Sequence, residues 1–148
     1  MELRHANHCV YKIRYHMVFC MKYRKKLLNN EILNFFKNVC SEIGERYCFE
    51  FDAIGCDGDH VHLFVGSEPK YSPSRVMQII KSITARKTFK EYPEIRKQLW
   101  GGELWSDGGY IGTVGYGTTS DIIKNYVENQ GTKEEKDAYK QMKIIDFQ

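Results

Sequence analysis

Residues 10–20 alternate between apolar and polar side chains, which is the pattern of a strand that covers a core with one face only. The apolar face carries Tyr11, Ile13, Tyr15, Met17 and Phe19. The polar face carries Lys12, Arg14 and His16. Two further strands are expected at residues 49–56 and 59–65, joined by a tight turn at residues 57–59. Residues 104–115 predict a fourth strand.

Apolar residues recur at helical spacing between these strands. Residues 29–47 predict a helix with Asn30 as its cap. Residues 71–92 predict a second helix, capped by Ser72 and with Pro73 in its first turn. Its apolar stripe consists of Val76, Met77, Ile79, Ile80 and Ile83. A short helical piece is expected after Pro93.

Two helices are predicted after the last strand. The first covers residues 119–130, begins at Thr119 or Ser120 and ends at Gly131. The second is a peripheral helix in the tail, where Thr132 and Glu135 form a capping box. We therefore divide the chain into a domain at residues 1–131 and a tail at residues 132–148.

The predicted order is βαββαβ followed by a helix. This is the order of a ferredoxin-like α+β fold, in which two helices cover one face of an antiparallel sheet. The helix at residues 119–130 is then an addition at the end of that fold.

Two histidines interrupt the apolar third strand. Side chains alternate along a strand, so Val61, Leu63 and Val65 face the helices, while His60 and His62 share the open face. In this fold the first strand is the neighbour of the third, so Lys12, Arg14 and His16 are expected to flank the two histidines. Two imidazoles so close can grip a divalent metal ion. The alternative is a pair of polar residues on a wetted sheet face. His16 either assists the site or is a bystander.

The helix at residues 119–130 carries polar groups that could complete such a site. Ile122, Tyr126 and Gln130 are spaced to lie on one helical face. Gln130 offers a neutral oxygen ligand, and Tyr126 offers a phenol that needs activation to act as a nucleophile. The alternative is that Tyr126 packs in the core and Gln130 ends a solvated helix.

Charge is distributed unevenly along the chain. The formal charge is only +3, but residues 1–100 carry 17 Lys and Arg against 11 Asp and Glu, while residues 101–148 carry 5 against 8. Basic residues gathered in one part of a chain suit contacts with phosphate groups, although a solvated surface can have the same composition. The residues that we expect to contact DNA are Lys12, Arg14, Lys22, Arg24, Lys25, Lys81, Arg86 and Lys87.

Cysteine usage and hydropathy indicate a cytoplasmic protein with no membrane partner. The five cysteines form no C-x-x-C pair, which suggests reduced thiols. The first residues lack the apolar stretch of a signal peptide. No segment approaches the roughly 20 apolar residues that span a bilayer.

Several motifs together carry a resemblance to a known family. "DHVHLFV" resembles the histidine–hydrophobe–histidine (HUH) motif of single-strand DNA nucleases, and "KNYVENQ" resembles the Y-x-x-x-Q helix of single-tyrosine, TnpA-type HUH transposases of small insertion sequences. "YHMVFCMKYRKKLL", "KSITARKTF" and "LWSDGGYIGTVG" also look like that family. The resemblance covers residues 8–131, with no departure at the motif positions.

The resemblance implies a mechanism. His60, His62 and Gln130 would hold one Mg²⁺ or Mn²⁺ ion at the scissile phosphate of single-stranded DNA, and Tyr126 would attack to form a 5′-phosphotyrosine link. A later 3′-OH would rejoin the strand, so that an element with hairpin ends is excised and integrated. The resemblance further implies a homodimer in which the tyrosine helix completes the partner's site, with Gly115 and Gly117 as a hinge.

Two other functions remain open at this stage. One is a nickase with the same chemistry, either a domesticated relative acting on repeated hairpins or a replication or conjugation enzyme. The other is a ferredoxin-like module that binds nucleic acid without catalysis, by stacking bases on the open sheet face. The aromatic residues of the first strand fall on the buried face, which weakens the second alternative.

Overall fold

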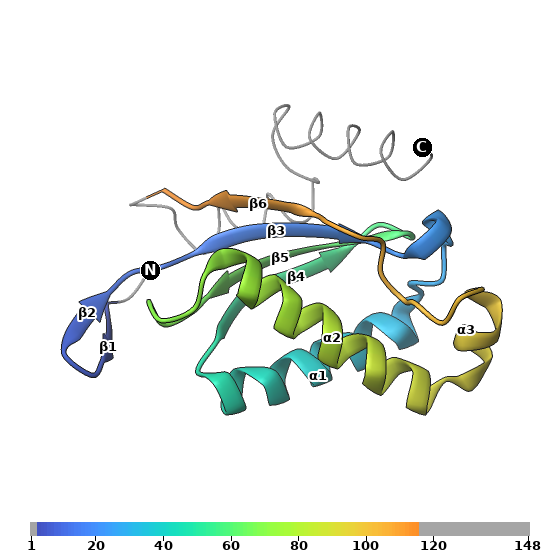
Figure 1. The fold of residues 1–148 in the computed structure, drawn as a ribbon, viewed down its shortest axis with the longest axis horizontal. Helices are drawn as coiled ribbons and strands as arrows, with labels where there is room; N and C mark the ends of the chain where they lie inside the picture. Colours follow the sequence, from blue (N-terminus) through green and yellow to red (C-terminus); the bar gives the residue numbers. More distant parts are fainter. Residues whose placement is uncertain (1–2, 116–148) are drawn as a thin grey trace.

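Four antiparallel strands and two long helices form the body of the protein (Figure 1). The computed structural model describes residues 3–115. The strands are β3 (Tyr15–Cys20), β4 (Glu50–Cys56), β5 (His60–Gly66) and β6 (Tyr110–Thr113), and their order in the sheet is β4-β5-β3-β6. Helices α1 (Asn30–Tyr47) and α2 (Pro73–Glu91) cover one face. The predicted ferredoxin-like α+β fold is therefore confirmed.

The predicted first strand is in fact two strands. Residues 9–11 form β2 (Cys9–Tyr11), which pairs with β1 (Arg4–Ala6) as a separate hairpin, and β3 begins only at Tyr15. His8 makes the hairpin turn possible by adopting a φ of 69°. Because the apolar alternation runs on through residues 12–14, the sequence pattern carries no sign of the break. Tyr11 is buried, but it lies outside the main core cluster.

Of the two predicted helix caps, the structure confirms one and shifts the other by one residue. Asn29, not Asn30, caps α1, because its side chain accepts a hydrogen bond from the Ile32 amide at 2.9 Å. Ser72 caps α2 as predicted and accepts from the Arg75 amide at 3.1 Å. The short helix α3 (Pro93–Gln98) follows α2, and a 3₁₀ turn, η1 (Lys22–Arg24), follows β3.

The core lies between the sheet and the two helices. Val61, Leu63 and Val65 of β5 are fully buried there, as the alternation predicts. The α2 stripe at residues 76–83 packs into the same cluster. Phe19 of β3 meets Trp105 edge to face, with ring centroids 4.7 Å apart. This face of the sheet is thus occupied by helices, and only the other face of β5 and β3 can present a site.

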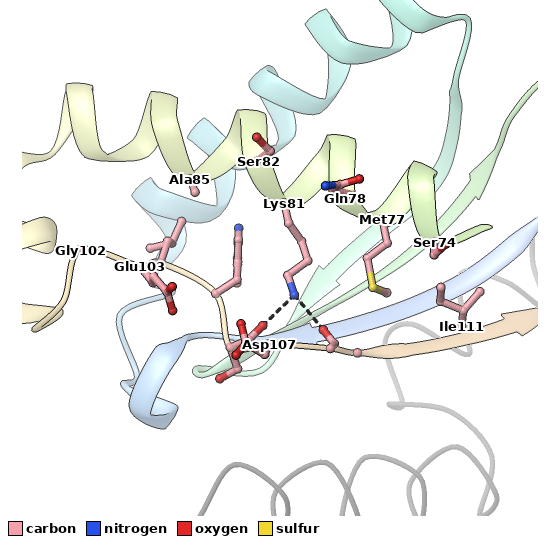
Figure 2. Close-up of a pocket in the computed structure, with 15 residues that line it drawn as sticks. Ser74, Met77, Gln78, Lys81, Ser82, Ala85, Gly102, Glu103, Asp107 and Ile111 are labelled. Carbon is pink, nitrogen blue, oxygen red and sulfur yellow. Dashed lines mark hydrogen bonds between the residues drawn. The ribbon is translucent and has the colours of Figure 1, made fainter. Parts of the chain in front are cut away.

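Lys81 of α2 holds the segment that leads into β6 (Figure 2). Its ammonium donates to the carbonyls of Ser106 at 2.7 Å and Gly108 at 2.8 Å. These contacts bridge an open groove of about 780 Å³ between α2 and residues 102–111. The lysine therefore fixes the position at which the chain enters the edge strand β6.

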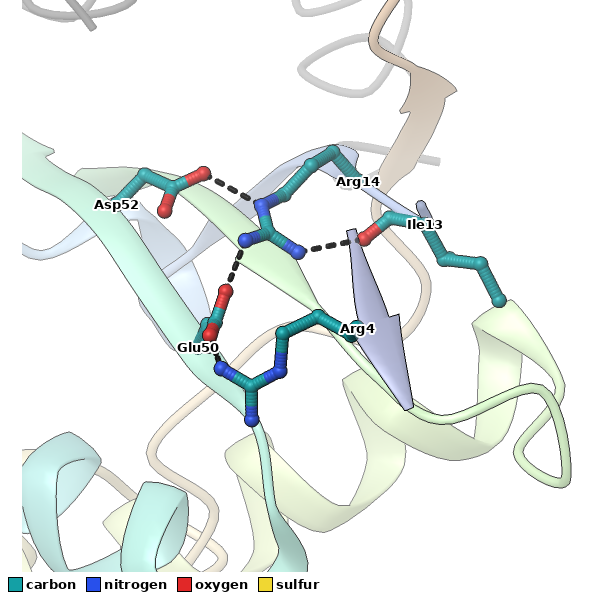
Figure 3. A network of polar contacts seen from close by, with 5 residues as sticks. All are labelled: Arg4, Ile13, Arg14, Glu50 and Asp52. Carbon is teal, nitrogen blue, oxygen red and sulfur yellow. Dashed lines mark hydrogen bonds and ion pairs between the residues drawn. The ribbon is translucent and has the colours of Figure 1, made fainter. Parts of the chain in front are cut away.

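Arg14 forms an ion-pair network at the start of β3 (Figure 3). Its guanidinium donates to Asp52 at 2.7 Å, to the Ile13 carbonyl at 2.9 Å and to Glu50, which also pairs with Arg4. A register shift between residues 51 and 53 of β4 frees Asp52 from the ladder for this contact. A Cβ at position 66 would overlap the guanidinium, so only glycine fits there.

The rest of the chain lies outside the described residues. This part includes Gly117, the predicted tyrosine helix with Tyr126 and Gln130, and the tail at residues 132–148. Among residues 3–115, no helix has the length and apolar character needed to cross a membrane.

The buried guanidinium of Arg14 predicts a measurable cost of its removal. Arg14→Met keeps an unbranched side chain but leaves Asp52 and Glu50 without this cation. We expect the free energy of unfolding to fall by about 1–3 kcal/mol, because both carboxylates are partly shielded from water. Urea denaturation measures this loss.

The matched control is Lys90→Met, which removes an exposed cation near the end of α2. We expect its unfolding free energy to change by less than about 0.5 kcal/mol. An unfolding midpoint for Arg14→Met that equals that of the wild-type protein would contradict the structural role of the network.

Candidate active site

His60 and His62 lie on β5 with their side chains on the face opposite the helices. Their Nε2 atoms are 3.0 Å apart, and the rings meet at an interplanar angle of 67°. The sequence placed both histidines on the open face of the sheet, with polar residues on a wetted face as the alternative to a metal site, but the two residues are only 2% and 4% exposed. The wetted-face alternative is therefore wrong for these two residues.

Each histidine is held at its other ring nitrogen. Asp59 Oδ1 lies 3.0 Å from His60 Nδ1, and His16 Nε2 lies 3.2 Å from His62 Nδ1. If His60 and His62 both donate their Nδ1 protons to these neighbours, both Nε2 lone pairs face the same point. Histidine ligands of metal ions usually carry such partners, which fix the tautomer and the ring orientation.

Burial also favours the neutral ring. Desolvation lowers the pKa of His60 below its usual value, while the hydrogen bond and charge of Asp59 act in the opposite direction. A neutral imidazole presents a lone pair at physiological pH, which a metal ligand requires.

His16 occupies a central position on β3. It pairs with Phe64 in the β3–β5 register, which makes it the diagonal neighbour of His62. Its ring stacks on those of His62 and Phe64, with centroids 5.4 and 4.8 Å away, and meets the edge of Tyr110. These contacts favour a role for His16 in orienting His62 over that of a bystander.

Arg24 and Asp59 form an ion pair beside His60, and the sequence did not predict this pair. The Arg24 guanidinium lies 3.3 Å from Asp59 Oδ2, and both side chains are less than 10% exposed. Tyr23 and Arg24 adopt φ values of 59° and 55°, which turn the chain sharply after β3. One carboxylate thus holds Arg24 with one oxygen and His60 with the other. The one feature of the sequence that could have indicated this pair is Asp59, which directly precedes the H-x-H motif.

The spacing of the two Nε2 atoms suits one metal ion. Two nitrogens 3.0 Å apart, each about 2.1 Å from an ion, subtend about 90° at it, which is the angle between adjacent octahedral ligands. Within residues 3–115, no cluster of three or more His, Cys, Asp or Glu side chains is arranged to bind a metal. Gln130, the third ligand that the sequence predicts, lies outside these residues.

The predicted basic residues do not all surround the histidines. Sequence reasoning placed Lys12 and Arg14 beside His60 and His62, but the antiparallel register puts Arg14 at the opposite end of β5, over Gly66. That expectation was wrong because the pairing register cannot be read from the alternation alone.

The other predicted DNA contacts fall into two groups. Lys22, Lys81 and Lys87 are engaged with Glu103, with backbone carbonyls and with Glu42, respectively. Lys12, Lys25 and Arg86 are exposed on the surface. The three lysines of the first group therefore already make contacts within the protein.

Sequence comparison identifies relatives over nearly the whole chain. A family model described as "Transposase IS200 like" matches residues 9–130. The ISDra2 transposase TnpA of Deinococcus radiodurans is 32% identical over 134 residues, which cover 90% of this chain and 95% of that protein. The transposase for insertion sequence element IS200 of Salmonella typhimurium is 26% identical over 83% of this chain and 80% of its own length.

Structural comparison agrees with these relatives. The crystal structure of a candidate transposase from Deinococcus radiodurans matches with a TM-score of 0.68 and 29% identity, over 87% of this chain and 98% of the other. A REP-associated tyrosine transposase bound to a REP hairpin matches with a TM-score of 0.52 over 84% of this chain and 67% of the other, and its 13% identity indicates a shared fold alone. Since the family match spans most of the chain and includes the paired histidines of β5, the protein belongs to the IS200-like transposase family and is a transposase.

Proposed function

We propose that this transposase cleaves and rejoins single-stranded DNA through a 5′-phosphotyrosine intermediate at a metal-dependent site. The observation that carries the proposal is the pair of His60 and His62 Nε2 atoms, 3.0 Å apart and each supported at Nδ1. His60, His62 and Gln130 would hold one Mg²⁺ or Mn²⁺ ion. Such an ion, when bound, makes the scissile phosphorus more electrophilic and offsets the charge that develops on the phosphate oxygens.

The chain itself supplies the nucleophile. The Tyr126 phenol oxygen attacks phosphorus, a tyrosine–phosphate bond forms, and the bond to the 3′-oxygen breaks. The phenol loses its proton and the departing 3′-oxygen gains one. In the second step another 3′-OH attacks the same phosphorus and Tyr126 is restored. The phosphodiester energy is kept in the covalent link, so rejoining needs no ATP.

The relatives support excision and integration of an insertion sequence as the biological role. Both sequence relatives are named as transposases of such elements. The hairpin-ended DNA substrate rests on the family resemblance, and the REP-associated neighbour, which is bound to a REP hairpin, is consistent with DNA as the partner. A domesticated nickase of repeated hairpins is less well supported, because that neighbour shares only the fold. A homodimer with sites shared between subunits remains part of the proposal through the resemblance of the tyrosine helix and the glycines before it.

Loss of the Tyr126 hydroxyl should abolish cleavage. Tyr126→Phe keeps the ring, so we expect the fold and the DNA affinity to be nearly unchanged while strand cleavage falls below detection, because a covalent nucleophile has no substitute. Denaturing gels of single-stranded DNA incubated with protein and Mg²⁺ would display the covalent adduct of the wild-type protein. Peptide mass analysis then locates it.

Three controls separate the parts of this proposal. Tyr110→Phe should form the adduct, whereas His60→Ala, or wild-type protein in EDTA, should bind DNA without cleaving it. An adduct on another tyrosine would refute the assignment of Tyr126. Efficient cleavage by Tyr126→Phe without any adduct would instead indicate a water nucleophile.

The contact between His16 and His62 predicts a role in metal affinity. His16→Phe keeps a ring that can stack on Phe64 but removes the ring nitrogen that lies 3.2 Å from His62 Nδ1. We expect the dissociation constant for Mn²⁺ to rise about 10- to 100-fold, the usual cost of losing a partner of a ligating histidine. Calorimetric titration of Mn²⁺ into the DNA-free protein measures this constant.

His16→Gln is the matched variant, because its amide oxygen can accept the same hydrogen bond. We expect it to recover part of the lost affinity. Thermal unfolding of both variants checks that the fold is intact. If His16→Phe binds Mn²⁺ as tightly as the wild-type protein does, His16 has no orienting role.

A further inference from the structure

Two exposed aromatic side chains lie together on the surface beside the active site. Among residues 3–115, the large apolar side chains that are exposed are Leu3, Val10, Tyr23 and Trp100. Trp100 is 86% exposed and Tyr23 is 49% exposed, and the Tyr23 hydroxyl donates to the Trp100 carbonyl at 2.8 Å. Leaving an indole in water forgoes the favourable burial of its large apolar area, so its position calls for a partner.

The backbone around Trp100 and Tyr23 holds both side chains at the surface. Leu99 is buried and anchors the end of α3, while Gly101 and Gly102 adopt φ values of 92° and 74° directly after Trp100. The Lys22 amide donates to the Leu104 carbonyl at 2.7 Å, which ties this turn to η1. Trp100 and Tyr23, which we call the aromatic platform, are thus carried by two turns that are fixed to each other.

The surroundings of the platform are basic. Residues 22–26 and 94–103 contain six Lys and Arg against two Glu. Lys25, Lys26, Arg96 and Lys97 are exposed, and Lys22 lies 5.8 Å from the centre of the Tyr23 ring. Exposed aromatic rings among cations are the usual means by which proteins bind single-stranded nucleic acid, because bases stack on the rings and phosphates meet the cations.

The platform is connected to the histidine pair through Arg24 and Asp59. Tyr23 directly precedes Arg24, whose guanidinium reaches Asp59, and Asp59 holds His60. The η1 turn that carries Tyr23 therefore lies next to the residues that hold His60. The six cations against two Glu in these segments give a net positive charge, which favours a strand of nucleic acid over an apolar protein surface.

We propose that Trp100 and Tyr23 bind unpaired bases of single-stranded DNA next to the cleaved phosphate by stacking. The inference rests on the proposed function for its substrate, but it concerns binding and involves neither the metal ion nor Tyr126. The platform holds the flanking bases, while the charged residues around it contact the phosphates without regard to sequence.

The chain offers a specific optical probe of this contact. It contains only two tryptophans. Trp105 is 6% exposed and donates its indole N–H to Thr84 at 3.0 Å, so a stacked base can reach only Trp100. Adding a short oligothymidylate to the protein in EDTA, where no cleavage occurs, should quench the tryptophan emission. Trp100→Phe should show no quenching but should keep most of the affinity.

Affinity is measured separately by the anisotropy of a labelled oligothymidylate. We expect Trp100→Ala to raise the dissociation constant about 5- to 100-fold, the usual cost of one lost stacked base. Replacing the bases with abasic sites should weaken wild-type binding and make Trp100→Ala neutral. Val10→Ala, a control at an exposed apolar residue of the β1–β2 hairpin, should bind like the wild-type protein.

Unchanged oligothymidylate affinity in Trp100→Ala would overturn the proposal. So would a change in self-association by sedimentation with no change in DNA affinity, because the patch would then serve a protein contact. Failure here is distinguishable from failure of the proposed function. The covalent adduct tests the chemistry, whereas quenching in EDTA tests the platform alone.

Discussion

Two buried imidazole nitrogens 3.0 Å apart impose the main constraint on this structure. If both rings carry their protons at Nδ1, their Nε2 lone pairs repel each other unless a cation lies between them. Burial makes a charged ring costly, so the surroundings favour two neutral rings. The features around the pair can be understood as means of holding it in that arrangement.

Two groups of residues hold the pair of histidines in place. On one side Asp59, itself held by Arg24, lies within hydrogen-bond distance of His60. On the other side His16 faces His62 and stacks on the rings of His62 and Phe64. The first group depends on the left-handed turn at Tyr23 and Arg24, and the second on the register of β3 against β5. The same turn displays Tyr23 beside Trp100. One short segment after β3 therefore supports both the histidine pair and the proposed aromatic platform.

The sequence predicted those features of the fold that follow from the periodicity of apolar residues. Alternation placed Val61, Leu63 and Val65 in the core and His60 and His62 on the other face, and capping residues located α2 closely. It could not predict what depends on register and tertiary contact. Arg14 looked like part of a basic stripe, but the pairing of β3 with β5 carries it to Asp52 and Glu50, far along the strand from the histidines. The positive φ values of Tyr23 and Arg24 leave no sequence signal, because neither residue is glycine.

The central claim is that His60 and His62 bind one divalent ion between their Nε2 atoms. Anomalous diffraction from crystals of the full chain soaked in Mn²⁺ tests it most directly. We predict one Mn²⁺ peak within about 2.1–2.3 Å of both nitrogens, with His62 Nδ1 still directed at His16. Crystals in which Mn²⁺ occupies other carboxylates while the two histidines remain in direct contact would contradict the account.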